Sequence, residues 1–254
     1  MLDERLIANL HVHELRRSEA HADREPHVLF QASTIAALLD GAYEGDLSFA
    51  ELAEHGDLGL GTLNGLDGEM IALDGRFYRA DLDGAVHPVD GSARTPFAVV
   101  VRFEAAVDVK LPGPLDHDGL LALIDEHAAS PTCAVRVDGE FDLVRARSVP
   151  RQQPPYRPLA EVAAEQHVFK LVDVRGTLVG FRFPDYAGGV EVTGHHLHFI
   201  ASDRTRGGHV LECRPRSGRL RLDTSSDLHV ELPPGVELGA GHVDSEALDR
   251  IERA

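Results

Sequence analysis

The segment GHHLHFIASDRTRGGHVLEC, residues 194–213, predicts two strands joined by a tight turn. Successive residues of a strand point to opposite faces, so His196 and His198 share one face. Leu197 and Phe199 share the other face, where their apolar side chains suit a core. The segment therefore indicates a β-rich region in which one strand carries a pair of neighbouring imidazoles.

A third histidine is expected to join this pair from the second strand. His209 follows the turn SDRTRGG, and a hairpin would bring it back beside His196 and His198. The pattern His-x-His-x10-His offers three nitrogens and leaves coordination positions open, which is typical of a catalytic rather than a structural zinc site. His195 points with Leu197 and is not counted as a ligand. Because the chain has fifteen histidines, a polar sheet face that is rich in histidine by chance is the alternative.

Short helices and strands are expected before this segment. Ser48 and Glu51 form a capping-box pattern, and Asp118 is the expected cap of a later helix. Asp-Gly pairs at 74–75 and 83–84, between alternating apolar runs, indicate hairpins. The predicted elements are helices at 31–41, 47–57 and 118–128 and strands at 69–73, 76–81, 85–89, 96–111, 133–137 and 143–149.

A proline-rich segment divides the chain. Residues 150–159, PRQQPPYRPL, contain four prolines and can be neither a helix interior nor a central strand. After it the sequence is mostly strand and turn, with strands predicted at 167–174, 177–183, 190–200, 208–214, 219–224 and 228–232 and a last helix at 244–254. We expect an α+β fold, with an N-terminal mixed β-sheet domain that includes short helices and a C-terminal β-barrel-like domain that carries the metal site. The expected divisions are a loosely ordered arm at 1–27 and domains at 28–150 and 151–254.

Composition excludes several classes of partner. The chain has 254 residues and a formal charge of −17, which disfavours binding to nucleic acid and to anionic membrane surfaces. An anionic small substrate would have to be met locally, by an arginine or a metal. Cys133 and Cys213 lack partners at metal-ligand spacing and are expected to be reduced and buried. The start of the sequence shows no apolar run long enough for a signal peptide, which favours a cytoplasmic location.

The histidine pattern alone leaves other functions open. A cupin-like metal oxygenase also places His-x-His on a barrel strand, although cupins usually add a glutamate a few residues later, and FIASDR supplies none. A non-catalytic metal-binding or metal-sensing protein is another possibility, but such a site would tend to be coordinatively closed.

The sequence resembles the acetolactate decarboxylase family in several long, separate segments. Residues 194–213 look like the metal-binding segment of that family, and residues 29–81 are similar to its N-terminal half. RSVPRQQPPYRPL at 147–159 and GTLVGFRFPDYAGGVEVTG at 176–194 also match, in the order of the family. The resemblance covers roughly residues 28–254. It implies a zinc enzyme, forming a homodimer through its N-terminal sheet, that converts 2-acetolactate to acetoin and carbon dioxide.

The resemblance also implies roles for individual residues. His196, His198 and His209 are the implied zinc ligands. Glu69, Arg147 and Glu252 are the implied catalytic residues, and Thr62 and Arg147 are implied to bind the substrate. Taken alone, Glu69 could be a surface residue at the start of a strand. Arg147 could belong to a structural salt bridge. Glu252 alone looks like a solvated helix residue, although Leu248 and Ile251 could dock the last helix.

These residue types suit the implied chemistry. Loss of carbon dioxide from a 3-oxo acid sends electrons into the ketone and gives an enediolate, which a metal Lewis acid can stabilise. The sequence shows no recognisable thiamine or pyridoxal site. Glu69 or Glu252 would then protonate the carbon, and Arg147 would hold the substrate carboxylate through a two-pronged contact.

Overall fold

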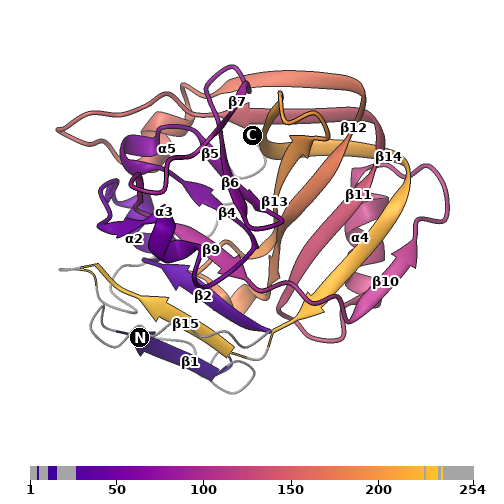
Figure 1. Ribbon diagram of the computed structural model, residues 1–254, viewed down its shortest axis with the longest axis horizontal. Helices are drawn as coiled ribbons and strands as arrows, with labels where there is room; N and C mark the ends of the chain where they lie inside the picture. The colour runs from indigo at the N-terminus through magenta and orange to yellow at the C-terminus, as the bar shows by residue number, and fades with distance from the viewer. Residues whose placement is uncertain (1–4, 6–10, 16–26, 226, 234–235, 237–254) are drawn as a thin grey trace.

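The computed structural model describes residues 5, 11–15, 27–225, 227–233 and 236 (Figure 1). Two large β-sheets pack against each other through a shared apolar core. Leu29 and Val99 of one sheet and Val179 and Ile200 of the other belong to this core and are fully buried. The mixed α+β character predicted from the sequence is therefore confirmed, with strands predominating.

The first sheet has eight strands, and it draws on both ends of the chain. Its order is β1 (His11–Leu15), β15 (Asp227–Glu231), β2 (Val28–Ala32), β9 (Ala98–Val101), β4 (Leu58–Thr62), β5 (Glu69–Leu73), β6 (Arg76–Ala80) and β7 (Val86–Pro88). β15 runs parallel to both of its neighbours, β1 and β2. A separate two-stranded ladder pairs β3 (Leu47–Ser48) with β8 (Arg94–Thr95).

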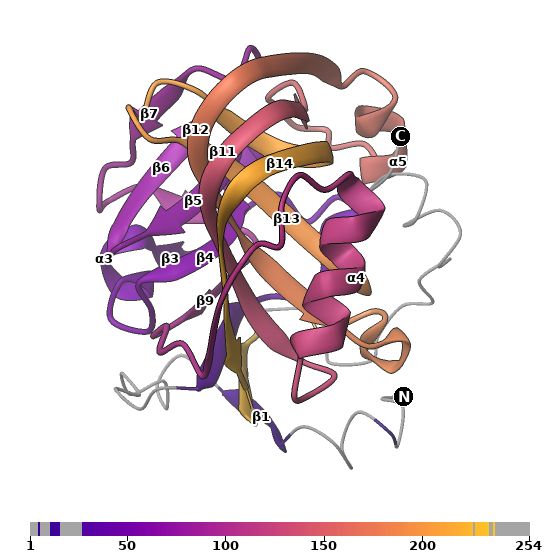
Figure 2. The same ribbon diagram turned by 90° about the vertical axis from the view of Figure 1, so that its right-hand side faces the viewer.

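The second sheet has five long strands and carries the histidine segment. Its order is β10 (Val107–Lys110), β14 (Gly207–Thr224), β11 (Cys133–Ser148), β12 (His167–Phe183) and β13 (Gly194–Ala201). The start of β14 also pairs with β13, so β11, β12, β13 and β14 form a closed circuit of pairings. The strands of the circuit arch strongly, as Figure 2 shows.

Short helices connect and cover the sheets. They are α2 (Ile35–Leu39), α3 (Phe49–Leu52), α4 (His117–His127), α5 (Leu159–Ala163) and the 3-10 turns η1 (Asn64–Leu66) and η2 (Asp185–Ala187). α4 packs on the outer face of the five-stranded sheet through Leu120 and Ile124 (Figure 2). In the described part of the chain α4 is the longest helix, and none reaches the length and hydropathy that a bilayer-spanning helix needs.

The helices predicted at 31–41 and 47–57 are shorter in the structure, where they are α2 and α3, and residues 31–32 belong to β2. Thr34 caps α2 by accepting the Ala37 N–H, and Ser48 and Glu51 make both hydrogen bonds of the capping box. The cap of α4 is Asp116 rather than Asp118, since the Asp116 carboxylate accepts the Gly119 N–H at 2.8 Å. Both aspartates suit an N-cap, and only the path of the preceding loop distinguishes them.

The single strand predicted for residues 96–111 is wrong. It is divided into β9 and β10, which belong to different sheets. Between them the N–H of Phe103 donates to the Asp57 carboxylate at 3.0 Å, and the N–H of Glu104 donates to Asp223 at 2.9 Å. Because these side chains take the place of a neighbouring strand, the ladder ends and the chain crosses from one sheet to the other.

The expected interruptions within β11, β12 and β14 are absent. Gly139 lies opposite both Gly176 and Gly218, so three glycines form a row across the sheet. A Cβ atom on Gly139 would lie 2.2 Å from the Ser217 carbonyl oxygen, which shows how closely the backbones approach. The glycine row lets three long strands bend together where the sequence predicted that each would end.

Each of the two sheets takes strands from both sides of residue 150, where the sequence predicts a domain boundary. β10 and β11 precede that residue and belong to the five-stranded sheet, whereas β15 follows it and pairs within the eight-stranded sheet. Residues 11–15, expected in a loosely ordered arm, form the edge strand β1. The proline-rich segment does lack strands, but β11 and β12 on its two sides are hydrogen-bonded partners. The sequence did not indicate this pairing, because strands that pair over a long separation leave no local signal.

Candidate active site

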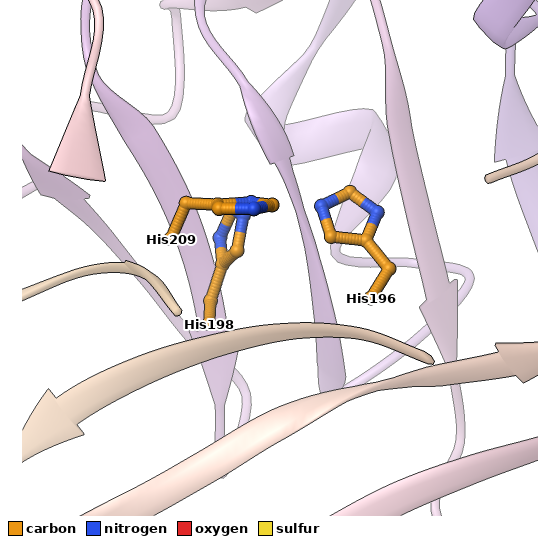
Figure 3. A group of neighbouring side chains, drawn as sticks. All are labelled: His196, His198 and His209. Atoms are coloured by element: carbon orange, nitrogen blue, oxygen red, sulfur yellow. The ribbon is translucent and has the colours of Figure 1, made fainter. Parts of the chain in front are cut away.

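Three histidines converge on the inner face of the five-stranded sheet. His198 and His209 are direct cross-strand partners on β13 and β14, and His196 lies two residues before His198 on the same face. Figure 3 shows the three rings turned toward one another. Ring centroids are 5.2 Å apart for His196 and His198, 5.0 Å for His196 and His209, and 5.4 Å for His198 and His209. One ring nitrogen from each lies within 4.8 Å of the other two, as a metal site requires.

Two of the imidazoles, those of His196 and His198, have lowered pKa values that favour the neutral form, which is the form that binds a metal ion. Burial and, to a lesser degree, the Arg147 charge lower the pKa of His196 to about 3. Burial and the neighbouring His196 hold the pKa of His198 well below its usual value. Nδ1 of His198 donates to the Met70 carbonyl oxygen at 2.8 Å, while its buried Nε2 makes no hydrogen bond. This arrangement fixes the ring and leaves Nε2 for a metal ion, so the donor set fits the predicted zinc.

Glu69 and Arg147, for which the resemblance implies catalytic roles, lie beside the histidines. Arg147 on β11 is the cross-strand partner of His209, and Glu69 is the first residue of β5 in the other sheet. Nη1 of Arg147 lies 3.7 Å from Oε1 of Glu69, and Nε2 of His198 lies 3.6 Å from Oε2. Both side chains are buried. The carboxylate therefore sits between a guanidinium and an imidazole at the contact between the two sheets.

Thr62 also lies at the site, although its hydroxyl is engaged. Thr62 is the cross-strand partner of Glu69 and lines the same pocket. Its hydroxyl donates to the Gly68 carbonyl oxygen at 2.8 Å, which holds the turn just before Glu69. In this structure Thr62 therefore supports the position of Glu69 and contributes to the pocket wall.

Part of the pocket lining is apolar, and sequence reasoning missed it. The polar part of the lining includes Glu69, Arg147 and the three histidines. The apolar part, called the apolar side below, consists of Ile35, Leu38, Leu66, Phe97, Val149 and Leu159. These residues come from five separate segments of the chain and read as ordinary core residues. Apart from the spacing of Ile35 and Leu38 on one helix face, no sequence signal marks them.

His195 and Glu252 are the remaining residues for which the sequence led to an expectation. His195 points away from the site, and its Nε2 lies 3.0 Å from the Asp125 carboxylate on α4. Its exclusion from the ligand set agrees with this position. Glu252 and the helix predicted at 244–254 lie outside the described residues, so the role of Glu252 remains a prediction.

Comparison with known proteins gives a consistent assignment. The family model for alpha-acetolactate decarboxylase matches residues 29–240. An alpha-acetolactate decarboxylase of Methylococcus capsulatus is 46% identical over 235 residues, which are 91% of this chain and 90% of the relative. One from Methanosarcina mazei is 46% identical over 233 residues, 89% of this chain and 80% of the relative.

The fold agrees with this assignment. The crystal structure of alpha-acetolactate decarboxylase from Bacillus subtilis strain 168 superposes with a TM-score of 0.85 at 34% identity, covering 89% of this chain and all of that one. The matched region includes the three histidines, Glu69 and Arg147. On the match to the family model and the identity to its members, the chain belongs to the alpha-acetolactate decarboxylase family.

Proposed function

We propose that this protein catalyses the zinc-dependent decarboxylation of 2-acetolactate to acetoin and carbon dioxide. The observation that carries the proposal is the group of three buried, convergent histidines beside Arg147 and Glu69 in a chain of this family. Zinc held by the three histidines would supply a Lewis acid for the negative charge that develops on oxygen as carbon dioxide leaves. Family membership favours this function over a cupin-like oxygenase or a non-catalytic metal-binding protein.

Arg147 binds the substrate carboxylate. Arg147 as a whole residue is 5% exposed, and in a site with little water a charged, two-pronged hydrogen bond to a carboxylate is strong. The β11 ladder beside β14 fixes the arginine next to His209, so the carboxylate is held at one end of the site. The protein as a whole carries a charge of −17, and Arg147 offsets that repulsion where the anion binds.

Glu69 manages the proton. Decarboxylation of the acetolactate anion consumes one proton at the carbon that loses carbon dioxide, and the products are neutral acetoin and carbon dioxide. Glu69 lies within 4 Å of both Arg147 and His198, so its carboxyl group reaches the reacting region and delivers that proton. Glu252 is the second candidate acid, as the family resemblance implies.

The direct test is acetoin formation from racemic 2-acetolactate by the purified protein. We expect activity that a strong chelator abolishes and that added Zn²⁺ restores, with about one zinc per chain by elemental analysis. Activity that survives complete metal removal would sink the zinc proposal. Oxygen uptake in place of acetoin formation would support the oxygenase instead.

The family resemblance also suggests the setting of the reaction. We propose a homodimer that associates through the eight-stranded sheet and acts in the cytoplasm. Sedimentation equilibrium tests the first part, with a mass near twice 27.6 kDa as the expected result.

A further inference from the structure

The apolar side of the pocket has a chemical counterpart in the substrate. Every polar group of 2-acetolactate, its carboxylate, hydroxyl and ketone, suits the side formed by the histidines, Arg147 and Glu69. Its methyl groups have no favourable contact there. Moving an alkyl group from water to an apolar wall is favourable, and more so with each added CH₂. The two sides of the pocket therefore sort the two kinds of substituent.

Two short helices form the wall at the apolar side. Ile35 and Leu38, three residues apart on α2, share one helix face, and Leu159 begins α5 beside them. Leu38 is 6% exposed and Leu159 is 8% exposed. They thus retain little contact with solvent while they border the pocket, so their size limits the space available to a bound group.

The backbone of α2 is held independently of these side chains. The Ile35 N–H donates to the Val190 carbonyl at 3.0 Å, and the Ala36 N–H donates to that of Gly189 at 3.2 Å. The Gln31 side-chain amide also donates to the Val190 carbonyl, at 2.8 Å. A shorter side chain at position 38 should therefore enlarge the pocket without releasing the helix.

We propose that the wall of Ile35, Leu38 and Leu159 is a subsite for the alkyl group on C2 of a 2-alkyl-2-hydroxy-3-oxo acid, and that Leu38 limits the length of that group. This inference rests on the proposed function and adds to it the residue that sets substrate size. Lengthening the C2 alkyl group leaves the ketone, the hydroxyl and the carboxylate unchanged, so a series of such substrates probes the apolar residues alone.

The test compares kcat/KM for 2-acetolactate and for its homologue with a propyl group on C2. Leu38→Ala should raise the ratio of propyl to methyl substrate by about tenfold or more, the scale of methylene discrimination in apolar pockets. Leu38→Phe should lower it. Leu39→Ala is the matched control, because Leu39 is on the same helix, is only partly buried and does not line the pocket. A ratio within twofold of wild type in both Leu38 variants would overturn the subsite.

Binding measurements separate this inference from the proposed function. Unreactive 2-alkyl-2-hydroxy acids without the ketone can be titrated calorimetrically whether or not turnover occurs. We expect Leu38→Ala to improve the Kd of the propyl compound relative to the methyl compound, with zinc content and Tm as checks of folding. If the wild-type protein turns over no acetolactate but Leu38→Ala still changes the relative Kd in this way, the proposed reaction is wrong and the subsite stands. If Leu38→Ala does not fold, Leu159→Ala is tested instead, with the same propyl-to-methyl ratios of kcat/KM and of Kd. Ratios unchanged from wild type would then overturn the proposal.

Discussion

His195 and His196 are adjacent on β13, and they face opposite sides of the same sheet. His195 points to the outer face, where its Nε2 lies 3.0 Å from an Asp125 carboxylate that also accepts Nε of Arg182 at 2.6 Å. His196 points to the inner face, where its ring centroid is 5.0 Å from that of His209. Burial is the largest cause of a lowered pKa in both histidines. A lowered pKa therefore does not distinguish a metal ligand from a structural histidine.

The difference lies in what surrounds each ring. A carboxylate bound to an arginine and an imidazole completes a local ion-pair network, which needs nothing further. On the inner face His196 meets two more imidazoles, and the neighbouring Glu69 carboxylate is shared with the Arg147 guanidinium, 3.7 Å away. Convergence of nitrogen donors, rather than burial, marks the inner face as a metal site.

The largest expected effect comes from breaking this convergence. His198→Ala should lose the metal and reduce acetoin formation to background, because two histidines cannot replace a three-nitrogen site. His195→Ala is the matched control on the opposite face, and it should keep full metal content. Its exposed partner limits the cost to about 0–1 kcal/mol of stability. Elemental analysis beside the acetoin assay checks both, and metal loss in His195→Ala would remove the distinction between the faces.

A smaller effect is expected from removing an acid while leaving the metal in place. Glu252→Gln, or deletion of residues 252–254, should reduce kcat on the order of 10²-fold or more, the scale of a lost acid–base group. Zinc content and Tm should stay near normal, since both Leu248 and Ile251 remain. Full activity in both variants would leave Glu69 as the sole proton donor.

Arg147→Lys should have a somewhat smaller effect at the same inner face. Lysine keeps the charge but not the planar, two-pronged donor, so kcat/KM for acetolactate should fall about 10- to 100-fold, as expected for loss of a charged hydrogen bond worth about 1.5–3 kcal/mol. Metal content should not change. An unaltered kcat/KM would show that Arg147 does not bind the substrate carboxylate.

The smallest effect concerns the outer face, where the buried thiols should be inert. Burial raises the pKa of both Cys133 and Cys213 to about 12. A thiol is deprotonated only as the pH approaches its pKa, so at pH 8 about one part in 10⁴ is the reactive thiolate. Native protein should resist iodoacetamide, and denatured protein should take up two equivalents. Rapid native labelling would show that the outer face opens readily.

The histidine site could be predicted because its information is local. The period of two in a strand places His196 and His198 together, and one short turn returns His209, so about fifteen residues contain the whole pattern. The capping box of Ser48 and Glu51 succeeded for the same reason. By contrast, the strand predicted at 96–111 failed because its ending depends on Asp57 and Asp223, which lie far away in the sequence.

The remaining parts of the site depend on packing between distant segments. Glu69 and Arg147 were reached through family resemblance, since neither has a distinctive local pattern. The apolar wall was missed because a leucine that lines a pocket has the same sequence pattern as a leucine in a core. The pairing of β11 with β12 across the proline-rich segment also had no local signal, because strand pairing over such separations is set by the whole fold.

The hydrogen bond from His198 to the Met70 carbonyl joins the two sheets at the metal site. β13 supplies the imidazole and β5 supplies the acceptor, while Glu69 on β5 meets Arg147 on β11. The complete site therefore cannot exist on either sheet alone. A metal ion that binds the complete site more tightly than the undocked sheets stabilises the docked state by RT ln(1 + [L]/Kd), where [L] is the free metal concentration and Kd is its dissociation constant at the complete site. Because all three histidines belong to the five-stranded sheet, the other sheet contributes to metal binding mainly through the Met70 carbonyl that orients His198, and metal affinity should be highest once the sheets are docked.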